Sequence, residues 1–339
     1  MEIKEKFPLV SHNTFGIDAQ ADWFIPYTSI EELQLLARDE YFQECRHLLL
    51  GEGSNMLFLT NFHGIVLHSQ ITTLETYEED EAHLTLLVGS GVHWDDLVAY
   101  TCARGLGGLE CLSLIPGQVG AAAVQNIGAY GAEISQRVVA VHTVHRRTGE
   151  LRHFAPEECD YAYRHSFFKT AEGADYIVTH VLLRLDKQPE LQLDYADLKA
   201  RVAARSAAPS PEDVRQEVIA IRRSKLPDPA ELGNAGSFFM NPIVPPARLT
   251  ELQETYPDIP HYPAPEGQVK LSAGWLIDRC GLKGFVLGHA GVYPRQALVL
   301  TNVDGEATGQ DIARLAQHVQ QQVQERFGIE LQPEVRYIS

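Results

Sequence analysis

Apolar residues recur along this chain at two different spacings, which predicts a protein of mixed helices and strands. Over residues 93–104 and 310–327 they stand three and four positions apart, the spacing of an amphipathic helix. Short apolar runs or alternating positions, both typical of strands, occupy residues 47–50, 56–59, 71–92, 138–144, 176–185 and 329–338.

Capping residues and prolines set further limits. Residues 29–32 form a capping box, so a helix is predicted to begin there. The helix predicted over residues 214–224 stops before the prolines of residues 226–229. Beyond Lys225 the chain becomes richer in Pro and Gly, and a short helix is predicted over residues 272–280. We therefore place a domain boundary near Lys225.

Length and charge narrow the possible functions. The 339 residues suggest two or three domains, and the formal net charge of −17 argues against a nucleic-acid partner. Five cysteines without a C-x-x-C pair indicate neither a disulfide framework nor a zinc site. No apolar stretch reaches the length of about 18 residues that a membrane helix needs. We expect a cytoplasmic protein with no membrane partner.

The first candidate binding loop is Gly51-Glu52-Gly53-Ser54-Asn55, which joins two predicted strands. Glycines let the backbone approach a ligand, and successive N–H groups in such a turn can bind an anion such as a diphosphate. A dinucleotide-binding Rossmann fingerprint needs a glycine where Met56 stands, followed by a helix. A Rossmann fold is therefore disfavoured, and a plain tight turn remains the alternative to a binding loop.

A second segment, residues 116–131, is rich in Gly and Ala. Small side chains over this length indicate that something lies close to the backbone, either a ligand or a closely packed helix. Taken together, the two separated glycine-rich loops favour a large dinucleotide-like cofactor.

Three further residues are candidates for chemistry. Arg164 stands between aromatic residues, where a guanidinium can bind a carboxylate, although a structural ion pair is the alternative. Ser237 precedes two phenylalanines and is either a turn residue or a proton donor in a dry site. Glu334 lies in the predicted last strand, where a solvated carboxylate is the ordinary interpretation. The 14 histidines show no ligand spacing, so no metal is expected.

The order of these motifs resembles that of the UDP-N-acetylenolpyruvoylglucosamine reductase family. The resemblance runs from Asn13 to Arg336, essentially the full length. The segments that carry it are Asn13-Thr14-Phe15-Gly16, residues 51–55, Ile115-Pro116-Gly117, residues 125–131, Tyr163-Arg164-His165-Ser166, residues 225–229, Gly236-Ser237-Phe238-Phe239 and residues 333–336.

The resemblance implies a vanillyl-alcohol-oxidase-type (PCMH-type) FAD-binding fold in two subdomains plus a C-terminal α+β domain for substrate. The first subdomain would comprise residues 1–69 with the strand of residues 330–339. The second would comprise residues 70–225, and the substrate-binding domain residues 226–329. A tyrosine loop near residues 190–198 indicates the type I subclass, in which Tyr195 would close over the substrate.

The resemblance also implies the reaction, in which FAD takes a hydride from NADPH and reduces UDP-N-acetylglucosamine enolpyruvate at the same site. Ser237 would protonate C2, while Arg164 and Glu334 would stabilise the enolate-like species. The expected cofactor-binding residues are Gly51, Glu52, Gly53, Ser54, Asn55, Met56, Pro116, Gly117, Gly120, Ala121, Asn126, Gly128, Ala129 and Gly131. The expected substrate-binding residues are Tyr130, Tyr195, Lys225, Asn241, Tyr262, Lys270 and Gln296.

One residue departs from the family pattern, because Met240 stands where a lysine is common, which puts one diphosphate contact in doubt. Two other functions are alternatives: a flavin oxidase of the same fold acting on another substrate, and a non-catalytic UDP-sugar or flavin-binding protein. The oxidase would leave Lys225, Ser237 and Glu334 unexplained. The intact set of Arg164, Ser237 and Glu334 argues against the non-catalytic protein. We expect a monomer.

Overall fold

The computed structural model describes residues 1–195 and 197–339, so Ala196 of the predicted tyrosine loop lies outside the described residues. The contacts within the chain group it into two compact units. The first comprises residues 1–7, 21–52 and 63–224, and the second residues 8–20, 53–62 and 225–339. The chain thus passes from one unit to the other four times before it does so finally after Ser224. The predicted division into three domains remains a prediction.

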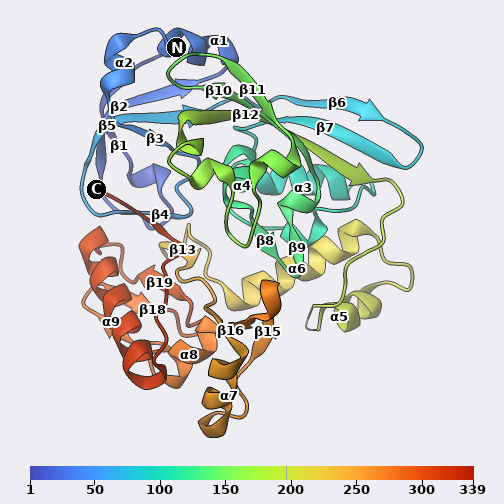
Figure 1. The fold of residues 1–339 in the computed structure, drawn as a ribbon, viewed down its shortest axis with the longest axis vertical. Coiled ribbons are helices and arrows are strands. Elements are labelled where there is room, and N and C mark those ends of the chain that lie inside the picture. Colours follow the sequence, from blue (N-terminus) through green and yellow to red (C-terminus); the bar gives the residue numbers. More distant parts are fainter. Residues whose placement is uncertain (196) are drawn as a thin grey trace. The chain divides into compact units, whose positions relative to one another are not determined.

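The first unit contains a four-stranded sheet in the order β1 (Lys4–Pro8), β2 (Gln20–Tyr27), β5 (Phe62–Ser69) and β3 (His47–Leu49) (Figure 1). Strands β3 and β5 are parallel. Helices α1 (Ile30–Leu36) and α2 (Glu40–Glu44) follow β2. The predicted cap of α1 is confirmed, since the Ser29 hydroxyl accepts the N–H of Glu32.

A five-stranded antiparallel sheet forms the rest of this unit's framework (Figure 1). Its order is β11 (Leu151–Phe154), β10 (Val138–His145), β12 (Tyr176–Asp186), β7 (His83–Gly89) and β6 (Leu74–Glu79). Helix α4 (Val119–Gln125) packs on β12 and β7. The buried Trp94 of α3 (Trp94–Cys102) belongs to the same core, together with residues of α5 (Leu198–Arg205) and α6 (Pro211–Lys225). The helices predicted over 93–104 and 214–224 and the strands over 138–144 and 176–185 are confirmed.

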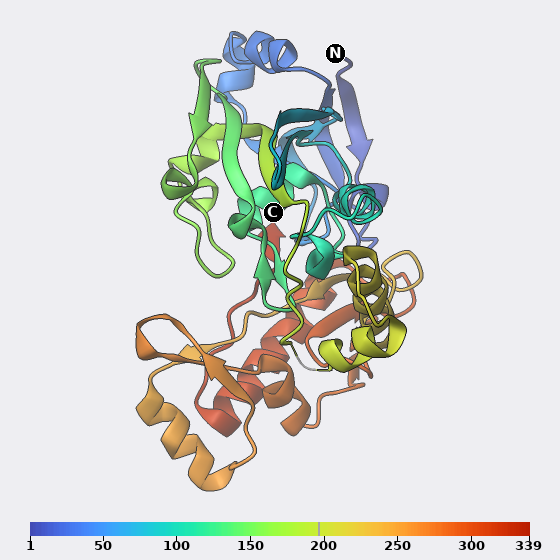
Figure 2. The same ribbon diagram turned by 90° about the vertical axis from the view of Figure 1, so that its right-hand side faces the viewer.

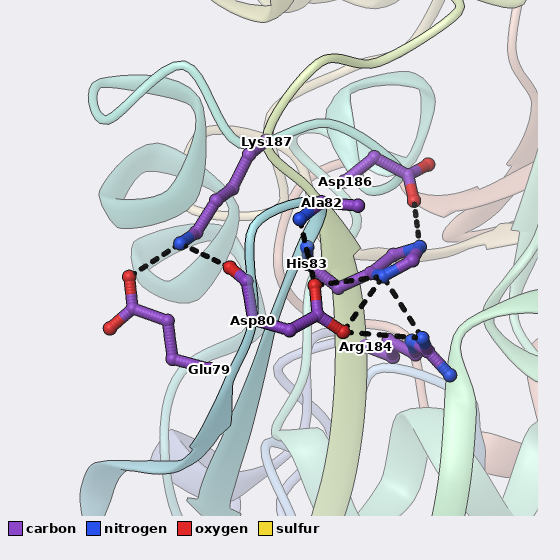
Figure 3. Close-up of polar contacts among 7 residues, drawn as sticks. All are labelled: Glu79, Asp80, Ala82, His83, Arg184, Asp186 and Lys187. Carbon is purple, nitrogen blue, oxygen red and sulfur yellow. Dashed lines mark hydrogen bonds and ion pairs between the residues drawn. The ribbon is translucent and has the colours of Figure 1, made fainter.

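Polar side chains tie the end of β12 to the hairpin of β6 and β7 (Figure 3). Asp80 Oδ1 accepts the backbone N–H groups of Ala82 and His83, both at 2.7 Å, which closes the hairpin turn. Lys187 follows β12 and donates to Glu79 Oε1 at 2.6 Å and to the carbonyl of Asp80 at 2.7 Å. The strand that leads toward the predicted tyrosine loop is therefore anchored at its end.

The second unit contains a sheet in the order β13 (Asn234–Ser237), β19 (Val299–Asn302), β18 (Ala290–Val292) and β17 (Val286–Leu287). The long helix α9 (Gly309–Phe327), red in Figure 2, packs against β18, β19 and α8 (Ala273–Arg279). Its predicted C-cap, Gly328, adopts φ +63°. A smaller sheet has the order β14 (Ile243–Val244), β16 (Val269–Leu271) and β15 (His261–Pro263), with α7 (Pro246–Thr255) between β14 and β15 in the chain.

The predicted strand after the first glycine-rich loop is confirmed, but the predicted tail strand is only partly correct. Strand β4 (Met56–Phe58) follows the loop, and β20 (Arg336–Ile338) pairs with it in parallel. Residues 329–335 are not a regular strand, because Pro333 has no N–H for a sheet ladder and makes only an isolated bridge with Phe239. No helix of the described residues is long and apolar enough to cross a membrane.

Candidate functional site

The first half of the loop Gly51–Asn55 belongs to the first unit and meets the second glycine-rich segment there. A Cβ on Gly51 would lie 3.6 Å from the methyl group of Ala121, an ordinary van der Waals contact. Glu52 Oε2 accepts the backbone N–H of Gly117 at 2.9 Å, and its Oε1 lies 2.6 Å from His93 Nδ1. Gly51 and Glu52 therefore lie against the second glycine-rich segment, and the Glu52 side chain links the two.

The second half of the loop belongs to the second unit, where Gly53 is required by the backbone. Gly53 adopts φ +64°, and a Cβ there would lie 2.2 Å from the carbonyl oxygen of His12. Asn55 Nδ2 donates to the carbonyl of Glu334 at 3.3 Å, and the Asn55 carbonyl accepts the N–H of Arg336 at 3.0 Å. The loop is thus fixed to the segment that carries a predicted catalytic residue.

Close packing of protein on protein explains part of the second glycine-rich segment. The N–H of Gly120 donates to the carbonyl of Ser90 at 3.0 Å, and a Cβ on Gly120 would lie 2.7 Å from Ser90 Cβ. Beneath it, Ser90 Oγ lies 2.6 Å from Ser69 Oγ in a buried hydrogen bond. Gly120 therefore lets the start of α4 pack closely against Ser90. At this position the small residue serves helix packing, which is the alternative to a ligand.

After α4 the chain forms a tight hairpin of β8 (Gly128–Ala129) and β9 (Ala132–Glu133). Its two turn residues, Tyr130 and Gly131, have φ of +52° and +84°, as a type I′ turn requires. Left-handed backbone is uncommon for a bulky residue and gathers at functional sites. Asn126 also has positive φ, and its amide donates to Glu133 Oε2 at 2.8 Å and to the Ala162 carbonyl at 2.9 Å.

Arg164 occupies a second strained turn beside this hairpin. The N–H of His165 donates to the Ala162 carbonyl at 2.9 Å, which closes the turn, and Arg164 adopts φ +55° within it. The guanidinium donates from Nη2 to the Gly128 carbonyl at 2.9 Å and lies 5.3 Å from the centre of the Tyr163 ring. The predicted catalytic arginine is thus held against a predicted cofactor-binding strand, in a conformation that ordinarily suits glycine.

The predicted lid residue Tyr195 packs against Tyr130 in the first unit. Their rings meet edge to face at 5.4 Å, and the side chain of Tyr195 is 45% exposed. The residues just before Tyr195 are held in place, because Cys111 Sγ donates to the Gln192 carbonyl at 3.5 Å and Leu193 packs against the buried core. Tyr195 therefore projects from a fixed base.

Ser237 and Glu334 come together in the second unit on adjacent segments. The N–H of Glu334 donates to the carbonyl of Phe238 at 2.8 Å, and the N–H of Met240 donates to the carbonyl of Gln332 at 2.9 Å. Both Ser237 and Glu334 are partly buried, while Phe238 is fully buried. Residues almost 100 positions apart are thereby placed side by side.

Five of the predicted substrate-binding residues lie in the second unit. Lys270 is the central member of a cross-strand row with Ile243 and Tyr262 on the small sheet. Asn241 Oδ1 accepts the N–H of Ala273 at 3.0 Å at the start of α8. Gln296 Oε1 would lie 3.0 Å from a Cβ placed on Gly274 of the same helix. A fifth, Lys225, ends α6. Their roles remain predictions.

Sequence reasoning missed Arg222, Arg215, Asp95 and His93. Arg222 lies one turn before Lys225 on α6, and its Nε is a buried donor without a hydrogen-bond partner in the structure. Burial lowers the pKa of Arg222, while Tyr130 and Asp95 oppose that shift. Burial likewise raises the pKa of Tyr130, and Arg222 opposes the rise. The partly buried guanidinium of Arg222 therefore interacts electrostatically with Tyr130 of the strained turn, and only its position near Lys225 could have suggested it.

Metal-binding groups were not predicted. Among the described residues, one group has ligand atoms close enough to share an ion, namely His289, Asp304 and Glu306. All three are exposed, and His289 Nδ1 lies 2.7 Å from Asp304 Oδ2. This ion pair accounts for the arrangement.

Comparison with known proteins first defines the class. Residues 22–155 match the family described as FAD binding domain. The crystal structure of p-cresol methylhydroxylase with substrate bound has the same fold, with a TM-score of 0.50 at 11% identity over 92% of this chain and 82% of its own. The predicted FAD-binding fold is confirmed, and the chain is a flavoprotein.

Comparison then gives the family. Residues 228–338 match the family described as UDP-N-acetylenolpyruvoylglucosamine reductase, C-terminal domain. The UDP-N-acetylenolpyruvoylglucosamine reductase of Porphyromonas gingivalis is 51% identical over 338 residues, which cover 100% of both chains. That of Burkholderia ambifaria is 47% identical over 96% of this chain and 94% of its own. The chain belongs to the UDP-N-acetylenolpyruvoylglucosamine reductase family.

A solved member of the family agrees with this assignment over the whole chain. The crystal structure of UDP-N-acetylenolpyruvylglucosamine reductase from Thermus caldophilus has a TM-score of 0.69 and 25% identity, and covers 100% of this chain and 98% of its own. The resemblance inferred from the motifs is therefore confirmed.

Proposed function

We propose that this protein reduces UDP-N-acetylglucosamine enolpyruvate to UDP-N-acetylmuramate with NADPH and bound FAD, a step in the synthesis of peptidoglycan precursors. The observation that carries the proposal is 51% identity, over the entire length, with a reductase named for this substrate. The residues that we assign to the chemistry, Arg164, Ser237 and Glu334, all stand in the segments that identified the family.

The two glycine-rich loops fit a dinucleotide cofactor. A Cβ on Gly51 would lie within van der Waals distance of Ala121, Glu52 bridges to Gly117, and Gly131 has no heavy atom within 4 Å of its Cβ position. We assign these loops, with Pro116 and Gly128, to the binding of FAD. When bound, FAD supplies the hydride chemistry, taking a hydride from NADPH and giving it to C3 of the enolpyruvyl group.

Arg164 would bind the substrate carboxylate and neutralise the charge that develops there. A guanidinium can donate two parallel hydrogen bonds to a carboxylate, which a lysine cannot do. The hydrogen bond from Nη2 to the Gly128 carbonyl and the stacking on Tyr163 orient the planar group. Orientation before the reaction matters because electrostatic stabilisation is most effective when no reorganisation is needed.

Ser237 would supply the proton at C2, and Glu334 would assist it. The overall addition is balanced, with a hydride from NADPH at C3 and one proton at C2. Since a serine hydroxyl is a weak acid, a relay must restore its proton. Glu334 must be protonated or share a proton to stabilise the enolate-like species, because a bare carboxylate would repel the developing charge.

Substrate recognition would rest on Lys225 and Lys270, with support from Tyr130, Tyr195, Asn241, Tyr262 and Gln296. In a chain of net charge −17, a diphosphate needs such local cations. Arg222 adds a third cation near Tyr130 in the first unit. Met240 cannot contribute the charge of a lysine, so these residues would carry the diphosphate. We infer further that the protein acts as a cytoplasmic monomer without a nucleic-acid partner.

An anaerobic titration of the purified protein tests the proposal in two steps. Addition of NADPH is expected to bleach the flavin absorbance, and subsequent addition of UDP-N-acetylglucosamine enolpyruvate is expected to restore it. Bleaching without recovery would keep the flavin reductase and reject this substrate. A protein that takes up no FAD would overturn the whole assignment.

A further inference from the structure

Asp95, in the first turn of α3, joins two distant segments of the first unit. Its carboxylate accepts two hydrogen bonds from the guanidinium of Arg215, at 2.6 Å from Nη1 and 2.9 Å from Nη2. Oδ1 also accepts the backbone N–H of Leu114 at 2.5 Å. Although burial opposes ionisation, these hydrogen bonds leave the pKa of Asp95 below its ordinary value. The carboxylate is therefore charged at neutral pH.

Leu114 needs such support because its backbone is strained. It adopts φ +58°, a region that residues other than glycine rarely enter. The same turn of α3 holds the residues on either side. The indole of Trp94 donates to the Leu112 carbonyl, and its backbone N–H donates to the Gly117 carbonyl, both at 2.9 Å. Hydrogen bonds from α3 thus fix residues 112–117 at Leu112, Leu114 and Gly117. Asp95 makes the one at Leu114, whose backbone is strained.

The other end of the ion pair fixes α6. Arg215 is only 8% exposed, and a buried guanidinium requires a partner. It stands seven residues before Arg222, so the two side chains share one face of the helix. The rotation of α6 about its axis, which turns Arg222 toward Tyr130, is therefore set by the same carboxylate that holds Leu114.

We propose that Asp95 and Arg215 are positioning residues for the flavin site. Their ion pair holds the left-handed turn at Leu114 and thereby the backbone of Pro116 and Gly117, which follows directly. The inference rests on the flavin-binding role proposed for this loop, and it is independent of the identity of the substrate. A merely structural ion pair would stabilise the fold without any specific link to the cofactor.

The affinity for FAD separates the two roles. Asp95→Asn keeps the shape of the side chain but removes its charge. We expect the dissociation constant of FAD, measured by quenching of flavin fluorescence on titration with apoprotein, to rise about tenfold. The melting temperature of the apoprotein is measured in parallel. An unchanged FAD affinity would overturn the proposal.

Asp186→Asn is the matched control, because Asp186 forms a similar ion pair in the same unit. Its Oδ2 lies 2.7 Å from Arg137 Nη1, and the two carboxylates are 28% and 31% exposed. Figure 3 shows Asp186 beside the hairpin of β6 and β7. We expect this variant to lower the melting temperature and to leave FAD affinity within about twofold of the wild type. Equal weakening of FAD binding in both variants would contradict a specific role for Asp95.

Leu114→Gly tests the proposed route. Glycine adopts positive φ without strain, so the turn no longer needs the carboxylate. We expect Asp95→Asn to weaken FAD binding by less than about threefold in the Leu114→Gly background. A full tenfold loss in that background would reject the link through Leu114.

Arg215→Lys provides a second variant if Asp95→Asn does not fold. It keeps the charge and loses the two-pronged contact. We expect FAD binding to weaken by about threefold or more, and Leu114→Gly to suppress the effect. Unchanged FAD affinity in this variant would also overturn the proposal. FAD affinity is measured without substrate, so these results can be interpreted even if the protein does not catalyse the proposed reaction.

Discussion

The backbone N–H of Glu334 donates to the carbonyl oxygen of Phe238, the residue that follows Ser237, over a distance of 2.8 Å. Together with the hydrogen bond from the N–H of Met240 to the carbonyl of Gln332, this bond places the proposed acid and the proposed stabilising carboxylate on adjacent segments of the second unit. The side chains of Phe238 and Phe239, which follow Ser237, are buried and anchor this segment in the core. The geometry is set by the backbone, so side-chain variants at Ser237 should leave it intact.

Ser237→Ala should therefore separate the two half-reactions. Without the hydroxyl, we expect reoxidation of the flavin by substrate to slow by about 10²–10⁴-fold, the usual contribution of a general acid. Reduction of the flavin by NADPH needs no proton at C2 and should stay within about twofold. Stopped-flow absorbance measures both rates on one preparation. An equal fall in the two rates would show that the acid role is wrong.

A pair of variants at Arg164 tests whether a functional residue is kept in a strained conformation. Both Arg164→Gly and Arg164→Ala should abolish most of the reaction with substrate, because the guanidinium is lost. Since φ at this position is +55°, the glycine variant should be more stable than the alanine variant by about 1 kcal/mol. Urea unfolding of both variants measures the difference. Greater stability of the alanine variant would contradict the strain.

Tyr195→Phe should weaken substrate binding without slowing the chemistry. The ring would still pack on Tyr130, while the hydroxyl that we assign to the substrate would be lost. We expect KM to rise about fivefold, the value of one neutral hydrogen bond, with kcat nearly unchanged. Tyr77→Phe, at an exposed position of β6, is the control. An unaltered KM in Tyr195→Phe would remove this residue from the site.

The sequence predicted the regular elements well where one physical pattern dominated. The apolar stripe and the capping residues of α9 are local signals, and the structure confirms the helix within one residue at its start. The apolar positions of residues 329–338 alternate as in a strand, but Pro333 among them has no N–H to donate to a neighbouring strand. Only Arg336–Ile338 pairs with β4. The apolar pattern alone therefore overestimates the length of a strand when a proline within it cannot form the backbone hydrogen bonds of a sheet.

The site was predicted as a set of motifs, but its internal connections were not. Asp95 and Arg215 are 120 positions apart, and no local feature of either segment indicates the ion pair. Leu114, Tyr130 and Arg164 adopt left-handed backbone without being glycine, which tertiary structure imposes against local preference. Sequence motifs thus identify candidate ligand-binding residues more readily than the residues that position them.

Two glycines in the predicted cofactor loops should respond very differently to substitution by alanine. A Cβ at position 53 would meet the His12 carbonyl oxygen at 2.2 Å, whereas a Cβ at position 131 meets no atom within 4 Å. Both positions have positive φ. We expect Gly53→Ala to destabilise the apoprotein by about 3 kcal/mol or more, and Gly131→Ala by about 1–2 kcal/mol. Denaturant unfolding curves measure both, and equal losses would refute the steric distinction.

Three histidines in a row across the five-stranded sheet should make the stability of the first unit depend on pH. His142 of β10 pairs in register with His153 of β11 and His180 of β12, and its ring stacks on that of His153 at 3.7 Å. Burial, reinforced by the two neighbouring histidines, lowers the pKa of His142 to about 4. Burial also lowers the pKa of His180, which the carboxylate of Glu75 partly opposes.

The unfolded chain therefore binds a proton at His142 below about pH 6.5, while the folded chain does not until about pH 4. Stability is fully present above the unfolded pKa and is lost as the pH falls through this window. We expect His142→Gln to reduce the loss between pH 7.5 and 4.5 by about 1–2 kcal/mol, a value discounted for the partial exposure of the ring. Urea unfolding across this range measures it, with exposed His63→Gln as the control. Parallel pH profiles for the wild type and His142→Gln would exclude His142 as the source, because a group that titrates alike in both states cannot couple folding to pH.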